Sequence, residues 1–223
     1  MARVRSVFEV IGPVMIGPSS SHTAGAVRLG NLARAVFGEA PVRADVTLHG
    51  SFASTGRGHG TDLALIAGLL GFAPDDERIR TATGEAAAAG LTVTFAAADL
   101  GEVHPNTASI ALTAADGRQG RVQGSSVGGA DVIVTGIDDF DVSITGELPV
   151  LVVEHTDRPG VVAAVTALLA GHAVNIASME VSREMRGARA LMVIETDQPV
   201  TTAVATDVGG AGGVTKVRTV PAV

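Results

Sequence analysis

The order of strand-like and helix-like patterns in the last third of the chain constrains its fold more than any other feature. The patterns run as a strand at 149–155, a helix at 157–172, strands at 173–182 and 188–196, a weak helix at 199–208 and a strand at 214–220. Asp157 is a candidate cap for the first of these helices, and Gly171 marks its end. This β-α-β-β-α-β order predicts a ferredoxin-like domain over residues 147–223.

The preceding residues, 1–146, predict a separate α/β domain, so the whole chain is expected to be α+β. Apolar residues recur at helical spacing between Leu29 and Val36, which predicts a helix over 23–37 with Ser20 or Ser21 as its N-cap. Further helices are predicted at 59–70, capped near Thr61, and at 83–90; strands are predicted at 42–50, 91–95, 107–113, 121–126, 131–134 and 141–145.

The composition limits the partners of the chain. A formal net charge of −7 argues against a nucleic-acid groove, which needs clustered Lys and Arg. No apolar run approaches the roughly 20 residues that span a bilayer, and residues 1–15 hold no sustained apolar segment typical of a signal peptide. We therefore expect a cytoplasmic protein that binds neither nucleic acid nor membrane.

Two absences limit the chemistry. The chain contains no cysteine, so it cannot by itself hold an iron–sulfur cluster or a zinc–thiolate site. Its one lysine, Lys216, lies outside any glycine-rich phosphate cradle, which argues against pyridoxal phosphate. Chemistry in this chain must therefore use His, Ser, Thr, Asp, Glu or Arg, or a group that a partner brings.

The stretch GPSSSHTAGA, at 17–26, lies where a loop enters the first predicted helix. Backbone N–H groups at a helix start, together with the hydroxyls of Ser19 to Ser21 and of Thr23, suit a carboxylate or phosphate. His22 adds a group that titrates near neutrality and can move protons. The alternative is a capped loop with an exposed histidine, which spacing alone favours.

A second polar stretch, HGSFASTGRGHGTD at 49–62, is read as a glycine-rich loop between a strand and a helix. Arg57 can clamp a carboxylate, and His59 is a second candidate for proton transfer. Two such stretches, each with a histidine among hydroxyls at a helix start, predict one shared site. His104, in EVHPNTAS, is by itself more simply a loop histidine before a proline-fixed bend.

The two polar stretches also carry a resemblance. SVFEVIGPVMIGPSSSHTAGAVRLG and LHGSFASTGRGHGTDLALIAG, followed by HPNT and SSVGG, closely resemble the β chain of the iron–sulfur-dependent L-serine dehydratases over about residues 6–145. HTDRPGVVAAV and VNIAS, within 148–220, resemble an ACT domain.

The resemblance implies an enzyme that deaminates L-serine to pyruvate and ammonia with a 4Fe–4S cluster, one iron of which acts as a Lewis acid. The cluster cysteines of this family lie in the α part, which is a separate subunit in two-chain members. The absence of cysteine here fits a β subunit that completes the active site without holding the metal. The same resemblance implies an N-terminal domain of the allosteric-substrate-binding type.

Residue roles follow from the matching positions. His22 and His59 are the expected proton-transfer groups; His59 is ranked first as the base, with Arg57 assisting, although the sequence does not separate the two histidines. The expected substrate-binding residues are Ser19, Ser20, Ser21, Thr23, Ser51, His104 and Asn106.

The ACT domain is expected to dimerise the chain and to bind a small amino acid through His155, Asp157 and Asn175. Serine-binding modules of this kind carry Asn where this chain has Asp157, which removes a donor. Two other interpretations stay open: a non-catalytic amino-acid sensor and a structural dimerisation piece. The sequence also leaves open a preference for serine or threonine.

Overall fold

The computed structural model describes residues 14–223. Most of residues 1–15, which show no signal-peptide pattern, therefore lies outside the described residues. The chain forms two compact units that divide between Thr135 and Gly136. The boundary predicted from sequence, between 146 and 147, lies just before the first strand of the ferredoxin-like arrangement and stays a prediction.

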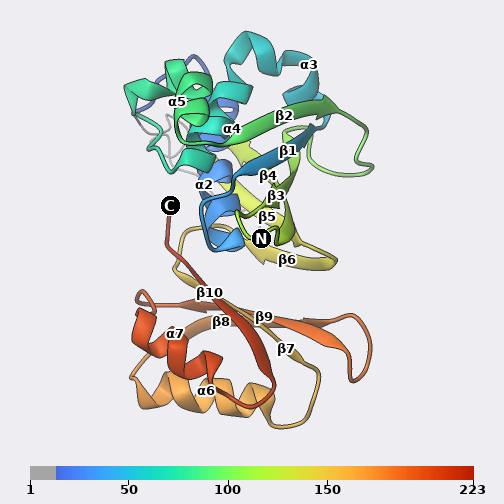
Figure 1. The fold of residues 1–223 in the computed structure, drawn as a ribbon, viewed down its shortest axis with the longest axis vertical. Coiled ribbons are helices and arrows are strands. Elements are labelled where there is room, and N and C mark those ends of the chain that lie inside the picture. The colour runs from blue at the N-terminus through green and yellow to red at the C-terminus, as the bar shows by residue number, and fades with distance from the viewer. Residues whose placement is uncertain (1–13) are drawn as a thin grey trace. The chain divides into compact units, whose positions relative to one another are not determined.

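The first unit combines helices with strands β1 to β4 and most of β5, whereas β6 follows the division at Thr135. These strands form one six-stranded sheet of order β2-β1-β3-β4-β5-β6, and the only parallel pair given by the register is β1 with β2. Figure 1 shows α2, α4 and α5 beside this sheet. The helical elements are a π-helical turn η1 (Ser20–Ala24), α2 (Gly25–Phe37), α3 (Gly50–His59), α4 (Thr61–Leu70), a 3₁₀ turn η2 (Glu77–Thr81) and α5 (Ala82–Ala88). The strands are β1 (Arg43–Leu48), β2 (Thr92–Ala97), β3 (Thr107–Thr113), β4 (Gln119–Gly128), β5 (Asp131–Ile137) and β6 (Phe140–Ile144).

Helices α2 and α4 form the core of the first unit against the sheet. Leu29 and Leu32 of α2 are fully buried, as the apolar spacing predicted. The two helix backbones approach closely because Gly30 and Gly68 face each other: a Cβ added at Gly68 would lie 2.1 Å from the carbonyl oxygen of Val27. The core beneath the polar stretches therefore depends on the absence of a side chain at this crossing.

The second unit contains the predicted β-α-β-β-α-β order. Its elements are β7 (Val150–Thr156), α6 (Val161–Gly171), β8 (Ile176–Arg183), β9 (Arg189–Thr196), α7 (Thr202–Gly209) and β10 (Val214–Val220). The strands form an antiparallel four-stranded sheet of order β10-β7-β9-β8, and α6 and α7 lie on one face of it (Figure 1). Leu151, Val165 and Ile194 belong to the core between the helices and the sheet. The α+β class is confirmed.

Three local expectations were wrong. The stretch 49–62 is not a loop, because residues 50–59 form helix α3. The side-chain cap of the first helical segment is Ser19, not Ser20 or Ser21. Gly160, in the left-handed conformation, precedes α6 in the cap position predicted for Asp157.

The cap expected at Thr61 or one of its neighbours lies at the neighbour Gly60. Gly60, with φ of 70°, occupies the N-cap position of α4, and Thr61 is the first residue of that helix. Glycine reaches positive φ at no steric cost, which allows α3 and α4 to follow one another with a single residue between them. None of the helices within residues 14–223 combines the length and the apolar character needed to span a bilayer.

Candidate active site

The two polar stretches that carry His22 and His59 meet in the first unit. The ring centroids of the two histidines lie 4.8 Å apart, with the ring planes tilted by 37°. His22 is in the π-helical turn η1 and His59 is the last residue of α3. The structure therefore brings together the two side chains for which the sequence predicted one shared site.

The position of His22 follows from the way the first polar stretch folds. The Oγ of Ser19 accepts a hydrogen bond from the backbone N–H of His22 at 3.2 Å, which caps the turn. Gly25, the residue that follows the turn, packs so closely that a Cβ there would lie 2.0 Å from the Oγ of Ser126. The turn is thus held at one end by a serine hydroxyl and pressed against strand β4 at the other.

Hydroxyl groups of α3 surround the Nε2 atom of His22. This atom lies 3.2 Å from the Oγ of Ser51 and 3.1 Å from the Oγ1 of Thr55. The two hydroxyl oxygens lie 3.2 Å from each other, and the Thr55 hydroxyl also donates to the Ser51 carbonyl at 2.8 Å. Ser51 was predicted as a substrate-binding residue; here it is a direct neighbour of the histidine.

The environment of His22 favours its neutral form. Partial burial of the ring lowers the pKa of His22 below its usual value of 6.5, and the neighbouring charge of His59 lowers it further. The buried ring of Phe52 packs edge-on against His22, with centroids 5.2 Å apart. A neutral imidazole at neutral pH is the form that can accept a proton.

His59 opens onto a cavity of about 290 Å³. Its Nδ1 atom lies 3.1 Å from the carbonyl oxygen of Thr55, which in the neutral ring places the proton on Nδ1 and leaves Nε2 as the acceptor. The cavity is also lined by Thr23 and by the exposed Arg80. Thr23 is buried, and its hydroxyl donates to the carbonyl of His59 at 3.4 Å.

The loop that contains His104 and Asn106 holds the start of α3. The carbonyl of Pro105 accepts a hydrogen bond from the backbone N–H of Ser51 at 2.8 Å. Gly50 has a φ of 53°, and a Cβ there would lie 2.7 Å from the same carbonyl oxygen. The side chains of His104 and Asn106 form hydrogen bonds of their own: the Nδ1 of His104 accepts from the backbone N–H of Asn106, and the side-chain amide of Asn106 donates to the Ser126 carbonyl.

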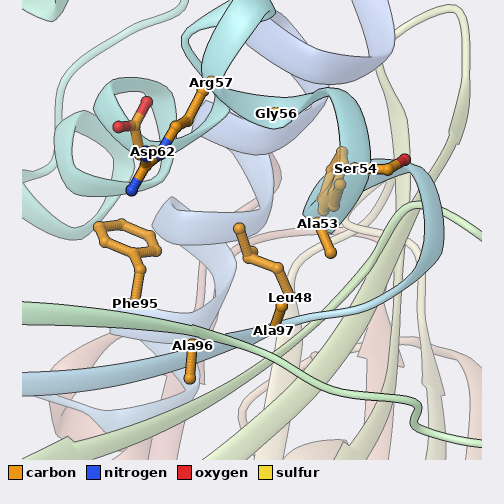
Figure 2. A pocket seen from close by; sticks show the side chains of 10 residues that line it. Leu48, Ala53, Ser54, Gly56, Arg57, Asp62, Phe95, Ala96 and Ala97 are labelled. Atoms are coloured by element: carbon orange, nitrogen blue, oxygen red, sulfur yellow. The ribbon is translucent and has the colours of Figure 1, made fainter.

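Arg57 lies apart from the histidine pair. It lines a different cavity, of about 450 Å³, together with Leu48, Phe52, Asp62 and Phe95 (Figure 2). Since Arg57 is two residues from both Thr55 and His59, helical spacing of about 100° per residue turns it about 160° away from them. The structure gives Arg57 no hydrogen bond or ion pair with any of residues 14–223, so it does not orient either histidine.

The three residues expected to bind an effector in the second unit do not meet within one chain. His155 pairs with Ala190 at one end of β9, whereas Asn175 precedes Ile176, which pairs with Thr196 at the other end. Six residues along a strand span about 20 Å. His155 is buried, and the side chain of Asn175 donates to Asp197 at 2.7 Å.

Asp157 is engaged in the turn between β8 and β9. Its Oδ2 accepts from the N–H of Gly187 at 3.1 Å and from Arg183 at 3.0 Å. The Gly187 N–H and then the Arg183 guanidinium lower the pKa of the Asp157 carboxyl. The carboxylate that replaces the expected Asn is thus compensated within its own chain.

Known proteins resemble this chain over most of its length. The model of the serine dehydratase beta chain family matches residues 6–95, and the ACT domain model matches residues 149–210. The probable L-serine dehydratase, beta chain, of Bacillus subtilis is 47% identical over 198 residues, which cover 89% of this chain and 90% of the relative. The chain belongs to the serine dehydratase β-chain family. The L-serine dehydratase, beta chain, of Peptoniphilus asaccharolyticus is 40% identical over 88% of this chain and 89% of its own.

The family resemblance stated from the sequence is therefore confirmed. A D-3-phosphoglycerate dehydrogenase of Synechocystis is 27% identical over 97 residues, which cover 44% of this chain and 18% of that protein. The ACT domain predicted in the C-terminal region is confirmed by its family model.

The donor set of this serine dehydratase β chain does not suit a 4Fe–4S cluster. The chain has no cysteine, and residues 14–223 bring together no group of three or more His, Asp or Glu side chains that could hold a metal ion. The described residues of this chain therefore do not fit the 4Fe–4S cluster that the resemblance implies.

Sequence reasoning missed three residues of the site: Phe52, Thr55 and Arg80. Helical spacing would have found Thr55, because Ser51, Thr55 and His59 recur every four residues along α3. Phe52 is the one large apolar residue within the polar stretch 49–62, which is a signal of burial. No sequence signal pointed to Arg80.

Proposed function

We propose that this chain is the β subunit of an L-serine dehydratase and supplies substrate-binding and proton-transfer groups for the deamination of L-serine to pyruvate and ammonia. A separate α subunit would hold the 4Fe–4S cluster. The observation that carries the proposal is the cluster of His22, His59, Ser51 and Thr55. The two relatives that cover most of this chain are both named beta chains of L-serine dehydratase, which supports the subunit assignment.

The hydroxyls around His22 accommodate both of its protonation states. Thr55 donates its own hydroxyl proton to the Ser51 carbonyl, so its Oγ1 is left as an acceptor for a protonated Nε2. When Nε2 is unprotonated, the hydroxyl of Ser51 can donate to it instead. The Nε2 atom of His22 therefore keeps a hydrogen-bond partner whether or not it carries a proton, which suits a proton relay.

His59 is the base that the geometry favours. Elimination of water from serine requires loss of the Cα proton, and the Nε2 of His59 is the ring nitrogen without a protein partner among residues 14–223. The adjoining cavity of about 290 Å³ is near the lower end of the range for small-molecule sites. A cluster held by an α subunit would supply the Lewis acid that assists departure of the hydroxyl group.

Arg80 is the group in this chain that suits the substrate carboxylate. It lines the same cavity as His59 and makes no hydrogen bond or ion pair with residues 14–223. A guanidinium binds a carboxylate with two parallel hydrogen bonds. This role replaces the one expected for Arg57, which faces the other side of α3.

The expected substrate-binding residues are proposed to act in two groups. Ser19 and Thr23 position the histidines through their hydrogen bonds, and Ser51 belongs to the relay. Ser20 and Ser21, in the same turn, are half-buried and remain proposed substrate contacts. His104 and Asn106 support the loop that holds the start of α3.

The ACT domain is proposed to dimerise the chain and to bind a small amino acid between copies. His155 and Asn175 lie at opposite ends of β9 in one chain, so a site that uses both requires a second chain. Strand β8 is the edge of the sheet and exposes Met179 and Val181. An edge strand with exposed apolar side chains is suited to pairing with another chain.

The proposal is tested by co-expressing this chain with a cysteine-bearing α chain of the same family and measuring pyruvate from L-serine. We expect His59→Asn to lower kcat by about 10²- to 10⁴-fold, the usual contribution of a general base. His22→Asn should lower kcat less and alter its pH profile, because it acts through the relay. Arg80→Gln should raise KM more than it lowers kcat.

The matched control is His172→Asn, which removes an exposed histidine of the second unit that pairs with Asp207 at 2.8 Å. Its complex should turn over at the wild-type rate. Wild-type rates for both His22→Asn and His59→Asn, in complexes with a full cluster content, would refute the assigned roles. A complex that forms, holds a cluster and never releases pyruvate would favour the amino-acid sensor instead.

A further inference from the structure

Helix α3 has a second functional face. The side chains that contact the histidines recur along one side, whereas Ala53, Ser54 and Arg57 line a cavity of about 450 Å³ on the other. The cavity is completed by the start of α4 and the ends of β1 and β2, as Figure 2 shows. The proposed function uses none of this space.

The cavity presents one cation and one anion. Arg57 is exposed and makes no hydrogen bond or ion pair with residues 14–223. Asp62 accepts one hydrogen bond, from the N–H of Leu63 to Oδ1 at 2.9 Å, and its Oδ2 has no partner among the same residues. The two charged groups line one cavity without forming an ion pair across it.

The remaining wall is apolar. Leu48 and Phe52 are buried beneath the cavity, and Phe95 stands at its side with 37% of its surface exposed. Ala53, Ala96 and Ala97 contribute only methyl groups. A ligand that fills such a space carries a carboxylate, an ammonium and an apolar part, which is the description of an α-amino acid with a small aliphatic side chain.

We propose that this cavity is a second amino-acid site, separate from the histidine cluster, that binds an α-amino acid with a small apolar side chain. The guanidinium of Arg57 receives the carboxylate in a bidentate arrangement. The free oxygen of Asp62 receives the ammonium. Phe95 and the methyl groups of Ala53 and Ala96 contact the side chain, above the buried Leu48 and Phe52.

The site is linked to the histidines through Phe52. The ring of Phe52 lines the cavity and also packs against His22, with centroids 5.2 Å apart. Because the ring itself has no exposed surface, a ligand acts on it through Ala53, the next residue of α3, and by shifting the helix changes the packing of His22. The amino acid would act as an effector of the histidine cluster rather than as its substrate.

The test is isothermal titration calorimetry of the full chain with L-valine, without an α subunit and without turnover, so its result is independent of the proposed function. We expect L-valine to bind, and isovalerate and isobutylamine to bind at least about tenfold more weakly because each lacks one charged group. Equal binding of L-valine and isovalerate would overturn the role of Asp62, and no binding of L-valine would overturn the site.

Two conservative variants locate the site. Arg57→Gln and Asp62→Asn should each weaken L-valine binding by about tenfold to a hundredfold, while Arg80→Gln, an exposed arginine at the other cavity, should leave it unchanged. Ala53→Leu, which fills the cavity from a helix, should also abolish binding. Unchanged binding in Arg57→Gln and Asp62→Asn, with wild-type circular dichroism, would place the ligand elsewhere.

The link to the histidines is measured by nuclear magnetic resonance. Addition of L-valine should shift the ring proton signals of His22, which Phe52 contacts. The same signals should stay in place when L-valine is added to Arg57→Gln. Saturating L-valine with no shift of the His22 signals would refute communication between the two faces of α3.

Discussion

Replacing Phe52 with alanine tests whether the site depends on one buried ring. Phe52 is fully buried, and its ring lies between the histidine cluster and the second cavity, the one of about 450 Å³ that Arg57 lines. Truncation of a buried Phe to Ala costs about 3–5 kcal/mol, through lost burial and the cavity left behind. The stability of a whole domain is only about 5–15 kcal/mol. We therefore expect Phe52→Ala to remove a large share of the stability of the first unit.

The measurement is urea unfolding followed by far-ultraviolet circular dichroism. Tryptophan fluorescence is not an option, since the chain has no Trp and no Tyr. With a urea slope of about 2 kcal/mol per M, a loss of about 4 kcal/mol lowers the midpoint by about 2 M. The chain has two compact units, so the transition of the first unit should move and that of the second should not.

Phe95→Ala is the matched control. Phe95 belongs to the same unit and also borders the second cavity, but 37% of its surface is exposed. Its removal opens a space already reached by solvent, and should cost about 1 kcal/mol or less. If the two variants lower the midpoint equally, or if Phe52→Ala lowers it by less than the control, burial of the Phe52 ring does not stabilise α3.

Two further predictions concern packing and pH. Gly68→Ala should destabilise the first unit by about 1–3 kcal/mol, because the new Cβ would lie 2.1 Å from the Val27 carbonyl; Gly84→Ala, with nothing within 4 Å, should be neutral or stabilising in the same unfolding assay. His22 should titrate below 6.5 by nuclear magnetic resonance, since burial and His59 lower its pKa. In the unfolded chain His22 binds a proton more readily than in the folded chain. The free energy of unfolding is therefore highest above pH 6.5 and falls as the pH drops from 6.5 to the folded pKa of His22. The His22→Asn variant should lose this contribution to the pH dependence.

The second unit was predictable because its signals are local. Apolar runs such as residues 150–153 predict strands, and the helix between them is marked by Pro159 near its start and Gly171 at its end. Helix α3 was not predictable in this way. Its residues include Gly56, Gly58 and several hydroxyl side chains, all of which disfavour a helix interior. The helix forms because Phe52 is buried and the Pro105 carbonyl accepts from its first turn, which are contacts with distant segments.

The prediction of a loop where helix α3 forms also explains why Arg57 was placed beside the histidines and Thr55 was missed. In a loop, every polar side chain of 49–62 can turn toward His22, so Arg57 and His59 were expected together. In a helix, spacing of about 100° per residue separates them. Ser51, Thr55 and His59 then share one face, and Arg57 faces another cavity. The contact of His22 with His59 was predicted because both polar stretches carry a histidine. The hydroxyl relay depends on helix α3, which its glycine and hydroxyl residues disfavour.

The weakness of α3 as a helix is consistent with its use. A helix with three glycines and several hydroxyls has little intrinsic stability, so its order depends on what its two faces contact. Phe52 is its one fully buried side chain, and this ring touches both His22 and the second cavity. A ligand on either face therefore acts on the same marginal element. Strong helix formers at the exposed positions would stabilise α3 and, by the same reasoning, reduce the influence of one face on the other.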